Sequence, residues 1–478
     1  MDLQSFMRQQ ADQEASLLAD LNQSLWNYAE FGYQEFQSSQ KIKEVLEQEG
    51  FEVELGVGGL PTAIKASFGK SGPVIGILGE YDALPNLSQE AGATEQRPIP
   101  GAQNGHGCGH SALGAGAVGA AILAKRYLQE TQKEGTIQFW GCPAEETGFG
   151  KTFMAREGCF SNLDAALTWH PSHANKAGAA RTVAYYKVRF DFHGRTAHAG
   201  TCPELGRSAL DACELMNVGV NYLREHIMSQ VRVHYAYLDC GGSSPNVVQE
   251  TSSLLYFVRA PKLKQCTEVL ERIQKIAEGA ALMTETKVKI SVLGGVSDII
   301  PNRTLAEVLS ESFVEQGGPD FTEEDYALAR NFIPTLPQQQ CMEWMQKAAL
   351  LNHMTLEEFK HRPLDTAINP FNPESMKVVV TGSSDVGDVS YLVPTAQIMV
   401  AASIPGTSPH TWQFTSQMGT SFSNKACVAA ARALGTACAK LYDRPEILKQ
   451  AKGELLKETH GEYQCPIPKE IDYTQVNP

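Results

Sequence analysis

The chain has 478 residues, of which 42% are hydrophobic and 20% are charged, and its net charge at neutral pH is −14. This length exceeds what one hydrophobic core usually serves, so two or three domains are expected. The acidic balance argues against nucleic acid or an anionic membrane as a partner, because both attract clustered Lys and Arg.

The cysteines and the first residues indicate the compartment. Eleven cysteines are scattered without the spacing of a disulfide framework, and the start lacks a basic region followed by an apolar one. Both features favour a cytoplasmic protein with reduced thiols. The longest apolar run, 112–124, is rich in glycine and is too short to span a bilayer.

The first 180 residues alternate between predicted helices and predicted buried strands. Apolar spacing predicts helix over 3–49, with a break at Gly32. A glycine-rich loop at 104–111 leads into a helix of small residues that ends near residue 128. A continuous apolar run predicts a buried parallel strand at 73–79, and further strands are expected at 136–140 and 163–169.

Polar side chains follow these strands at the points where they are expected to end. Asp82 comes soon after the first strand, Glu145 and Glu146 follow the second, and His170 follows the third. In open α/β sheets, ligands bind beyond the carboxyl ends of the strands. We therefore expect these four side chains to gather at one edge of the sheet.

A different pattern begins near residue 182. Residues from Tyr186 to Phe192 alternate between apolar and polar side chains, which is typical of a half-buried antiparallel strand. The following elements complete the order β-α-β-β-α-β, which is the ferredoxin-like arrangement. The sequence thus predicts an inserted domain at 182–296, between the two parts of a first domain at 1–181 and 297–478.

The last third of the chain returns to the first domain. A helix is expected at 303–316, followed by a polar helical insertion at 317–375 whose role the sequence does not indicate. Residues 381–389 are expected to form a loop, and a strand at 397–403 precedes His410. A helix at about 420–442 and a charged tail, expected to pack weakly, complete the chain.

Six side chains near the predicted strand ends could together bind metal: Cys108, His110, Glu145, Glu146, His170 and His410. Thiolate, imidazole and carboxylate are the usual ligands of zinc-like ions, and six groups exceed the needs of one tetrahedral site. Two divalent cations are therefore expected. Since neighbouring side chains point apart, one glutamate of the 145–146 pair can bind metal while the other takes a proton from water.

These motifs resemble those of the M20 family of metallopeptidases and amidohydrolases. The resemblance rests on Asn-Gly-His-Gly-Cys-Gly-His at 104–110, Glu-Tyr-Asp-Ala-Leu-Pro at 80–85 and Gly-Ser-Ser-Asp-Val-Gly-Asp-Val-Ser at 382–390. It implies an α/β fold in which helices flank a mixed, mostly parallel sheet, and in which the inserted α+β domain acts as lid and dimerisation domain. Many relatives have Asp where this chain has Ser111, which we expect to cap the following helix instead.

The resemblance also implies roles for individual residues. The ligands of two Zn, Mn or Co ions would be Cys108, His110, Glu146, His170 and His410, with His106 outside the ligand set. Glu145 would be the general base, and Asp82 would orient a ligand histidine from behind. In the lid, His198 would reach a neighbouring subunit's site and steady the oxyanion, while Asn246 and Arg259 would recognise the substrate's carboxylate.

The implied reaction is hydrolysis of the amide bond in an N-acyl or N-aroyl amino acid, with p-aminobenzoyl-glutamate as the first substrate to expect. The implied assembly is a homodimer through the inserted domain, with a second kind of subunit left open. Alternatives are a dipeptidase, an N-acetyl-amino-acid deacetylase and a non-catalytic partner chain that retains the fold. A cysteine hydrolase built on Cys108 is a further rival, but it leaves the Glu145–Glu146 pair unexplained.

Overall fold

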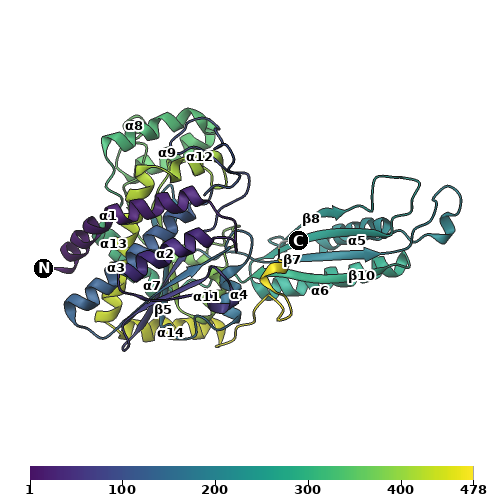
Figure 1. Ribbon diagram of the computed structural model, residues 1–478, viewed down its shortest axis with the longest axis horizontal. Coiled ribbons are helices and arrows are strands. Elements are labelled where there is room, and N and C mark those ends of the chain that lie inside the picture. Colours follow the sequence, from purple (N-terminus) through teal and green to yellow (C-terminus); the bar gives the residue numbers. More distant parts are fainter. Residues whose placement is uncertain (477–478) are drawn as a thin grey trace. The chain divides into compact units, whose positions relative to one another are not determined.

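The computed structural model describes residues 1–476 and divides into two compact units. The larger unit comprises Met1–Ala180, Ile300–Val378 and Val389–Tyr463. The smaller unit comprises Arg181–Ile299, Val379–Asp388 and the segment that begins at Gln464. The sequence assigned these last two segments to the first domain, whereas in the structure they group with the smaller unit. In Figure 1 the helices α1, α3 and α13 mark the larger unit, and α5, α6 and β7 mark the smaller one.

An eight-stranded mixed sheet forms the centre of the larger unit. Its strand order is β1-β2-β4-β3-β5-β12-β6-β11, and the four neighbours β4, β3, β5 and β12 run parallel to one another. The mostly parallel sheet with flanking helices that the sequence predicted is confirmed. The strands are β1 Glu52–Leu55, β2 Ile64–Phe68, β3 Val74–Glu80, β4 Thr136–Cys142, β5 Ala165–Ser172, β6 Asn175–Gly178, β11 Ile368–Asn369 and β12 Thr395–Ala401.

Helix α3, the helix of small residues, is buried on almost every side because it packs between the sheet, α1 and α13. A Cβ atom added at Gly116 would lie 2.7 Å from the ring of Trp169. Small residues therefore allow the close approach that holds the start of α3 at the sheet edge.

The helices of this unit are α1 Leu3–Tyr28, α2 Phe36–Gln48, α3 His110–Thr131, α4 Gly150–Arg156, α7 Arg303–Gln316, α8 Glu323–Phe332, α9 Gln338–Leu351, α10 Leu356–His361, α12 Trp412–Met418, α13 Ser421–Asp443 and α14 Glu446–Thr459. Helix α11, Val386–Leu392, has residues in both units.

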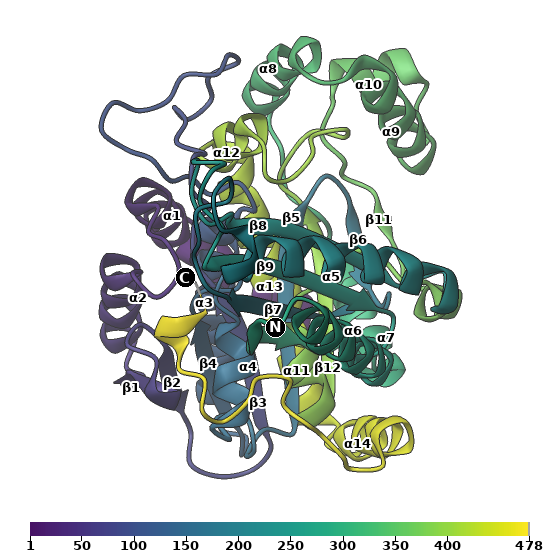
Figure 2. The same ribbon diagram turned by 90° about the vertical axis from the view of Figure 1, so that its right-hand side faces the viewer.

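The smaller unit contains a four-stranded antiparallel sheet with the order β10-β7-β9-β8. Figure 2 shows α5 and α6 across one face of this sheet, and their apolar residues build a separate core with it. The chain order is β7-α5-β8-β9-α6-β10, the β-α-β-β-α-β order expected from the sequence. The elements are β7 Ala184–His193, α5 Ala209–Leu223, β8 Arg232–Asp239, β9 Thr251–Ala260, α6 Leu263–Met283 and β10 Lys287–Val296.

The C-terminal segment packs more tightly than its charge suggested. Val476 is buried, and its carbonyl accepts a hydrogen bond from Nζ of Lys187 at 2.6 Å. This contact buries a lysine of β7 that the alternating pattern placed on the exposed face. The expectation of a weakly packed tail was therefore wrong for the part that reaches Val476.

Several local predictions also differ from the structure. Strand β5 continues to Ser172, so His170 lies inside the strand rather than after it. The loop expected at 381–389 ends earlier, because α11 begins at Val386. The predicted helical insertion contains α8, α9 and α10, which share a small hydrophobic core. Among the described helices, none combines the length and the apolar character that crossing a membrane requires.

Candidate metal centre

Seven potential ligand side chains lie close together in the larger unit. Their ligand atoms form three groups, each with all atoms within 4.8 Å of one another. Cys108 belongs to two of these groups, one with His110 and His170 and one with Glu146 and His410. The third group contains Glu80, His110 and Glu145. The six predicted ligand and base residues are therefore brought together, and Glu80 joins them.

The loop before α3 brings two of these ligands to the sheet edge. Gly109 adopts a positive φ of 82°, which favours glycine, and α3 begins at His110. Ser111 lies inside the helix and does not cap it, so that expectation was wrong. The backbone N–H of Ser111 instead donates to Nδ1 of His106 at 3.2 Å, and Nε2 of His106 lies 2.9 Å from the carbonyl of Leu25. His106 is thus held by protein atoms and stays outside the groups.

His110 is oriented from behind by a carboxylate. Its Nδ1 donates to Oδ1 of Asp82 at 2.8 Å, while Oδ2 of Asp82 accepts the backbone N–H of Glu146 at 2.9 Å. Nε2 of His110 therefore faces the ligand groups. Burial lowers the pKa of a histidine, but here the interactions with the sulfur of Cys108 and with the carboxylates of Asp82 and Glu80 outweigh it and raise the pKa of His110.

Replacing Asp82 by Asn should weaken metal binding about 10-fold to 100-fold, because second-sphere carboxylates orient ligand histidines and raise their basicity. Competition with a chelator measures this affinity. At saturating metal, turnover should recover to within about threefold of the wild type. Asp164→Asn is the control, since Asp164 also accepts a backbone N–H, that of Val74, but lies outside the ligand groups. Equal metal affinity in Asp82→Asn and wild type would contradict the assigned role.

A buried ion pair that the sequence did not indicate supports the same histidine. Nζ of Lys151, which is 0% exposed, lies 2.6 Å from Oε1 of Glu80. The other oxygen of Glu80 lies 3.2 Å from Nε2 of His110. The charge of Lys151 offsets the burial of Glu80 and keeps the pKa of that carboxyl below its ordinary value. A lysine inside an otherwise apolar stretch gave no pattern that could have revealed this pair.

His170 faces Cys108 through its second ring nitrogen. Nδ1 of His170 lies 2.8 Å from the carbonyl of Pro171, so it carries the proton and donates. This leaves Nε2 as the acceptor, 3.4 Å from Sγ of Cys108. Burial and the nearby Glu146 raise the pKa of the Cys108 thiol well above its ordinary value. Without a cation the thiol therefore stays protonated at neutral pH.

The loop that carries His410 is tied directly to the glycine-rich loop. The backbone N–H of His410 donates to the carbonyl of Gly107 at 2.8 Å, and His410 has a φ of 61°. This left-handed conformation is uncommon for histidine and is often found at functional sites. Nε2 of His410 lies 3.3 Å from Oε1 of Glu146.

The turn with Glu145 and Glu146 is anchored by Glu35 at the start of α2. Oε1 of Glu35 accepts the backbone N–H of Ala144 at 2.8 Å, and Oε2 accepts the hydroxyl of Thr62 at 2.7 Å. Ala144 has a φ of 55°, so the turn is held in a left-handed conformation just before the glutamate pair. Burial, with the nearby charge of Asp82, raises the pKa of Glu35 to about 8.

This raised pKa predicts a pH-dependent stability. Because the folded protein holds the proton of Glu35 more tightly than the unfolded chain, the stabilisation is complete below about pH 4.5 and is lost as the pH rises through about 8. Glu35→Gln removes this titration. As the pH rises from 5 to 8, the melting temperature of Glu35→Gln should therefore increase relative to that of the wild type. Glu44→Gln, an exposed change on α2, is the control. Parallel curves for Glu35→Gln and wild type would contradict the prediction.

The donors fit bound divalent cations. Nε2 of His110 and Oε1 of Glu146 are buried, and among the described residues their contacts with Glu80 at 3.2 Å and His410 at 3.3 Å are ion pairs without hydrogen-bond alignment. Unsatisfied buried polar atoms are costly, and a cation removes the cost by accepting their lone pairs. Thiolate, imidazole and carboxylate donors also match the preferences of zinc and of similar first-row metals.

The three predicted lid residues lie in the smaller unit, where two of them meet. The backbone N–H of Ala199 donates to the carbonyl of Asn246, beside His198. Nδ1 of His198 accepts the N–H of Gly200 at 3.2 Å, so Nε2 carries the ring proton. Arg259 lies near the other end of β9, where it contacts the hydroxyl of Ser383 and the ring of Tyr185.

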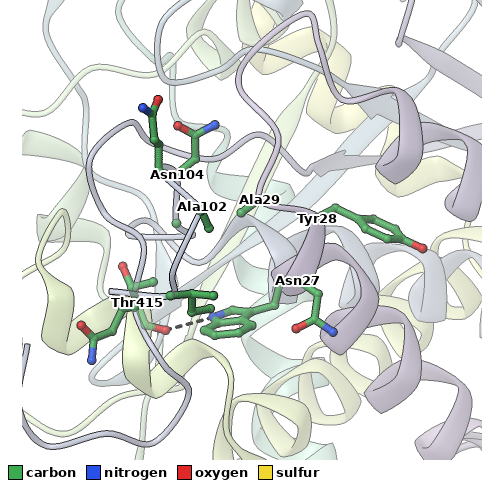
Figure 3. A pocket seen from close by; sticks show the side chains of 12 residues that line it. Asn27, Tyr28, Ala29, Ala102, Asn104 and Thr415 are labelled. Atoms are coloured by element: carbon green, nitrogen blue, oxygen red, sulfur yellow. Dashed lines mark hydrogen bonds between the residues drawn. The ribbon is translucent and has the colours of Figure 1, made fainter. Parts of the chain in front are cut away.

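A separate pocket of about 290 Å³ lies behind the glycine-rich loop. Figure 3 shows Asn27, Ala102 and Asn104 around it, and the indole N–H of Trp26 donating to the carbonyl of Thr415. Among the described residues that line the pocket, none is a His, Cys, Asp or Glu. Its lining therefore offers no imidazole, thiolate or carboxylate ligand.

Comparison with known proteins identifies the family. Residues 76–349 match the family described as Peptidase family M20/M25/M40. The chain is also 41% identical over 455 residues to one of the subunits of p-aminobenzoyl-glutamate hydrolase from Escherichia coli (strain K12), with 95% of each chain covered. The chain belongs to peptidase family M20/M25/M40. As an M20 peptidase, the protein is a metal-dependent hydrolase of amide bonds, and the prediction from its motifs is confirmed.

Solved structures of M20-like proteins share the fold. An aminobenzoyl-glutamate utilization protein from Klebsiella pneumoniae matches with a TM-score of 0.61 and 17% identity, covering 93% of this chain and 100% of that one. A Bacillus subtilis protein described as a dinuclear metal binding peptidase from the M20 family matches with a TM-score of 0.57 and 16% identity, covering 90% and 99%. At these identities the likeness establishes the M20 fold.

Proposed function

We propose that the protein binds two divalent cations and hydrolyses the amide bond of an N-aroyl or N-acyl amino acid, with p-aminobenzoyl-glutamate as its first candidate substrate. The observation that carries the reaction class is the pair of ligand groups that share Cys108, with Glu145 beside them. The substrate class rests on the Escherichia coli relative, which has 41% identity over nearly the whole chain. Zn, Mn and Co all suit the donors.

In this proposal Cys108 would contribute a donor to the ligand sets of both cations. His110 and His170 complete one ligand set, and Glu146 and His410 complete the other. Bound cations supply a water of lowered pKa and polarise the scissile carbonyl. Glu145 takes the proton of that water and passes it to the leaving nitrogen. Asp82, Glu80 and Lys151 hold His110 in place throughout.

The lid residues would act on the substrate from two directions. His198, with its proton on Nε2, suits donation to an oxyanion, and Asn246 lies next to it. Arg259 comes eight residues after the first residue of β9, a separation of about 26 Å along the strand. One substrate cannot contact both ends of β9. His198 would therefore act on the substrate of a second copy, while Asn246 and Arg259 would recognise a substrate carboxylate, as the family resemblance implies.

A homodimer supplies that second copy. The proposed interface, which we call the α5–β8 surface, has exposed apolar side chains on α5 at Leu215, Val218 and Tyr222, and exposed Tyr235 and Leu238 on β8. Strand β8 is an edge of its sheet, with one side open to pairing. Large apolar side chains at helical spacing beside an open edge favour a protein partner.

The mass of the protein in solution tests this assembly. Wild type should elute with twice the 52.1 kDa of the chain. The double change Val218→Asp with Tyr222→Asp should give a monomer that has lost turnover but keeps its metal. Val314→Asp, an exposed change in the larger unit, should remain dimeric. A monomeric wild type with full activity would refute the dimer and the assignment of His198.

A substrate panel tests the function itself. Metal-loaded protein should cleave p-aminobenzoyl-glutamate faster than acetyl-glutamate, acetyl-cysteine or dipeptides. Faster cleavage of dipeptides or acetyl-amino acids would favour a dipeptidase or a deacetylase. No turnover of any substrate, with metal bound, would indicate a non-catalytic partner chain. Because the Escherichia coli relative is described as one subunit of its enzyme, the assay should be repeated with a second kind of subunit if the chain alone is inactive.

Chelation separates the metal mechanism from a cysteine hydrolase. The 3.4 Å separation between Sγ of Cys108 and Nε2 of His170 is also the geometry of a thiol beside a base. A chelator should abolish turnover, and added Zn, Mn or Co should restore it. Activity that persists after complete removal of metal would support the cysteine hydrolase.

A further inference from the structure

Helix α9 lies in the insertion whose role the sequence left open. It contacts two segments, one that follows β5, the strand that contains His170, and one that follows β12 and leads to His410. Sγ of Cys341 lies 3.5 Å from the carbonyl of Pro405, on the segment between β12 and His410. Gly406 follows, and a Cβ atom there would lie 2.6 Å from Cα of Cys341. Figure 1 shows α8, α9 and α12 grouped at one end of the larger unit.

One turn further along α9, Trp344 reaches the second segment. Its ring centroid lies 4.6 Å from that of His173, with the planes inclined at 60°. His173 comes three residues after the ligand His170, just past the end of β5. Trp344 is therefore placed beside the carboxyl end of the strand that presents His170 to the metal centre.

The indole of Trp344 is held in place yet remains exposed. Nζ of Lys347 lies 4.4 Å from the ring centroid, a cation–π contact, and His173 packs against the indole in a T-shaped contact. All five tryptophans lie in the described part of the chain, and Trp344 is the exposed one among them, at 38%. An immobilised, partly exposed aromatic ring next to the end of the strand that carries His170 is suited to receive another ring.

The electrostatic surroundings of this face also suit an uncharged ring. Burial, together with the charges of Lys176 and Lys347, lowers the pKa of His173 to about 4. His173 is therefore neutral at pH 7.

We propose that Trp344, held by His173 and Lys347, forms the wall that receives the aromatic acyl group of the substrate, so that the 317–375 insertion sets the preference for aroyl over small acyl groups. This inference rests on the proposed function, because it assigns part of the substrate to one side of the same site. It makes Trp344 a specificity-determining residue and leaves the catalytic groups unchanged.

Paired substrates test the assignment. In Trp344→Leu, kcat/KM for p-aminobenzoyl-glutamate should fall about tenfold, because the contact between the two aromatic rings is lost, whereas kcat/KM for acetyl-glutamate should change less than twofold. Trp344→Phe should recover most of the loss. Leu350→Ala, an exposed change on α9, is the matched control and should leave both substrates unaffected. Equal losses for both substrates, or no loss, would overturn the proposal.

Binding distinguishes this inference from the proposed function. In a Glu145→Gln background, calorimetry should show p-aminobenzoyl-glutamate binding that weakens about tenfold when Trp344→Leu is added. If the wild type binds this compound but does not cleave it, and Trp344→Leu weakens the binding, the proposed function fails and the wall assignment stands. If the compound does not bind, or binds equally with and without Trp344, the wall assignment is wrong.

Discussion

Glu145→Gln should lower kcat by about 10³-fold on the substrate that the wild type cleaves fastest, while leaving the metal content unchanged. The glutamine keeps the size of the side chain but cannot accept the proton of water, and general bases contribute roughly 10²–10⁴-fold to such reactions. Steady-state kinetics and metal analysis of the same preparation measure both effects. Glu134→Gln, an exposed change before β4, is the control for a lost carboxylate.

The neighbouring glutamate should behave differently. Glu146 shares a ligand group with Cys108 and His410, so Glu146→Gln should lower the metal content as well as the turnover. Adjacent residues in one turn would then give two distinct phenotypes. If Glu145→Gln lost metal and Glu146→Gln kept it, the roles of the two glutamates would have to be exchanged.

Cys108→Ala should have an equally large effect, through the metal. Cys108 belongs to two of the three ligand groups, so removing its thiol removes a donor from each of those two. We expect the bound metal to fall by at least one ion per chain and turnover to fall at least about 10³-fold. Elemental analysis after dialysis measures the metal. Added metal should not restore full turnover, because the bridging donor is absent.

A cysteine outside the site controls for the loss of a thiol. Cys159 is partly exposed and belongs to none of the ligand groups, so Cys159→Ala should retain both metal and turnover. A Cys108→Ala protein that keeps its full metal content but loses turnover would favour the nucleophilic role of this cysteine over the bridging one.

Much of the larger unit could be predicted, because its signals are local. A continuous apolar run marked the first buried strand, and polar residues near the predicted strand ends marked the edge where Glu145, Glu146 and His170 lie in the ligand groups. The glycine-rich loop pointed to Cys108 and His110. β5 extends two residues beyond His170, because strand ends are the least certain part of such predictions.

The supporting residues could not be predicted, because their roles depend on contacts between distant segments. Glu35 anchors the turn before Glu145 from α2, and nothing near Glu35 indicates that partner. Lys151 reaches Glu80 from a different element, across a separation in sequence that no periodicity encodes. The burial of Lys187 likewise depends on a distant segment, because its Nζ donates to the carbonyl of Val476. Tertiary contacts of this type become visible only in the folded chain.

The strand order of the larger sheet has a consequence for how the protein is made. Strand β12 pairs with β5 and lies between β5 and β6, yet the ribosome completes almost all of the smaller unit before it synthesises β12. Cys108, His110 and His170 emerge early, whereas His410 follows β12. At roughly 5–20 residues per second, the nascent chain carries the residues of two ligand groups for tens of seconds before His410 is made and the third group can form. Under the proposed function, the cation held by Cys108, Glu146 and His410 would therefore be the last to bind, after β12 enters the sheet.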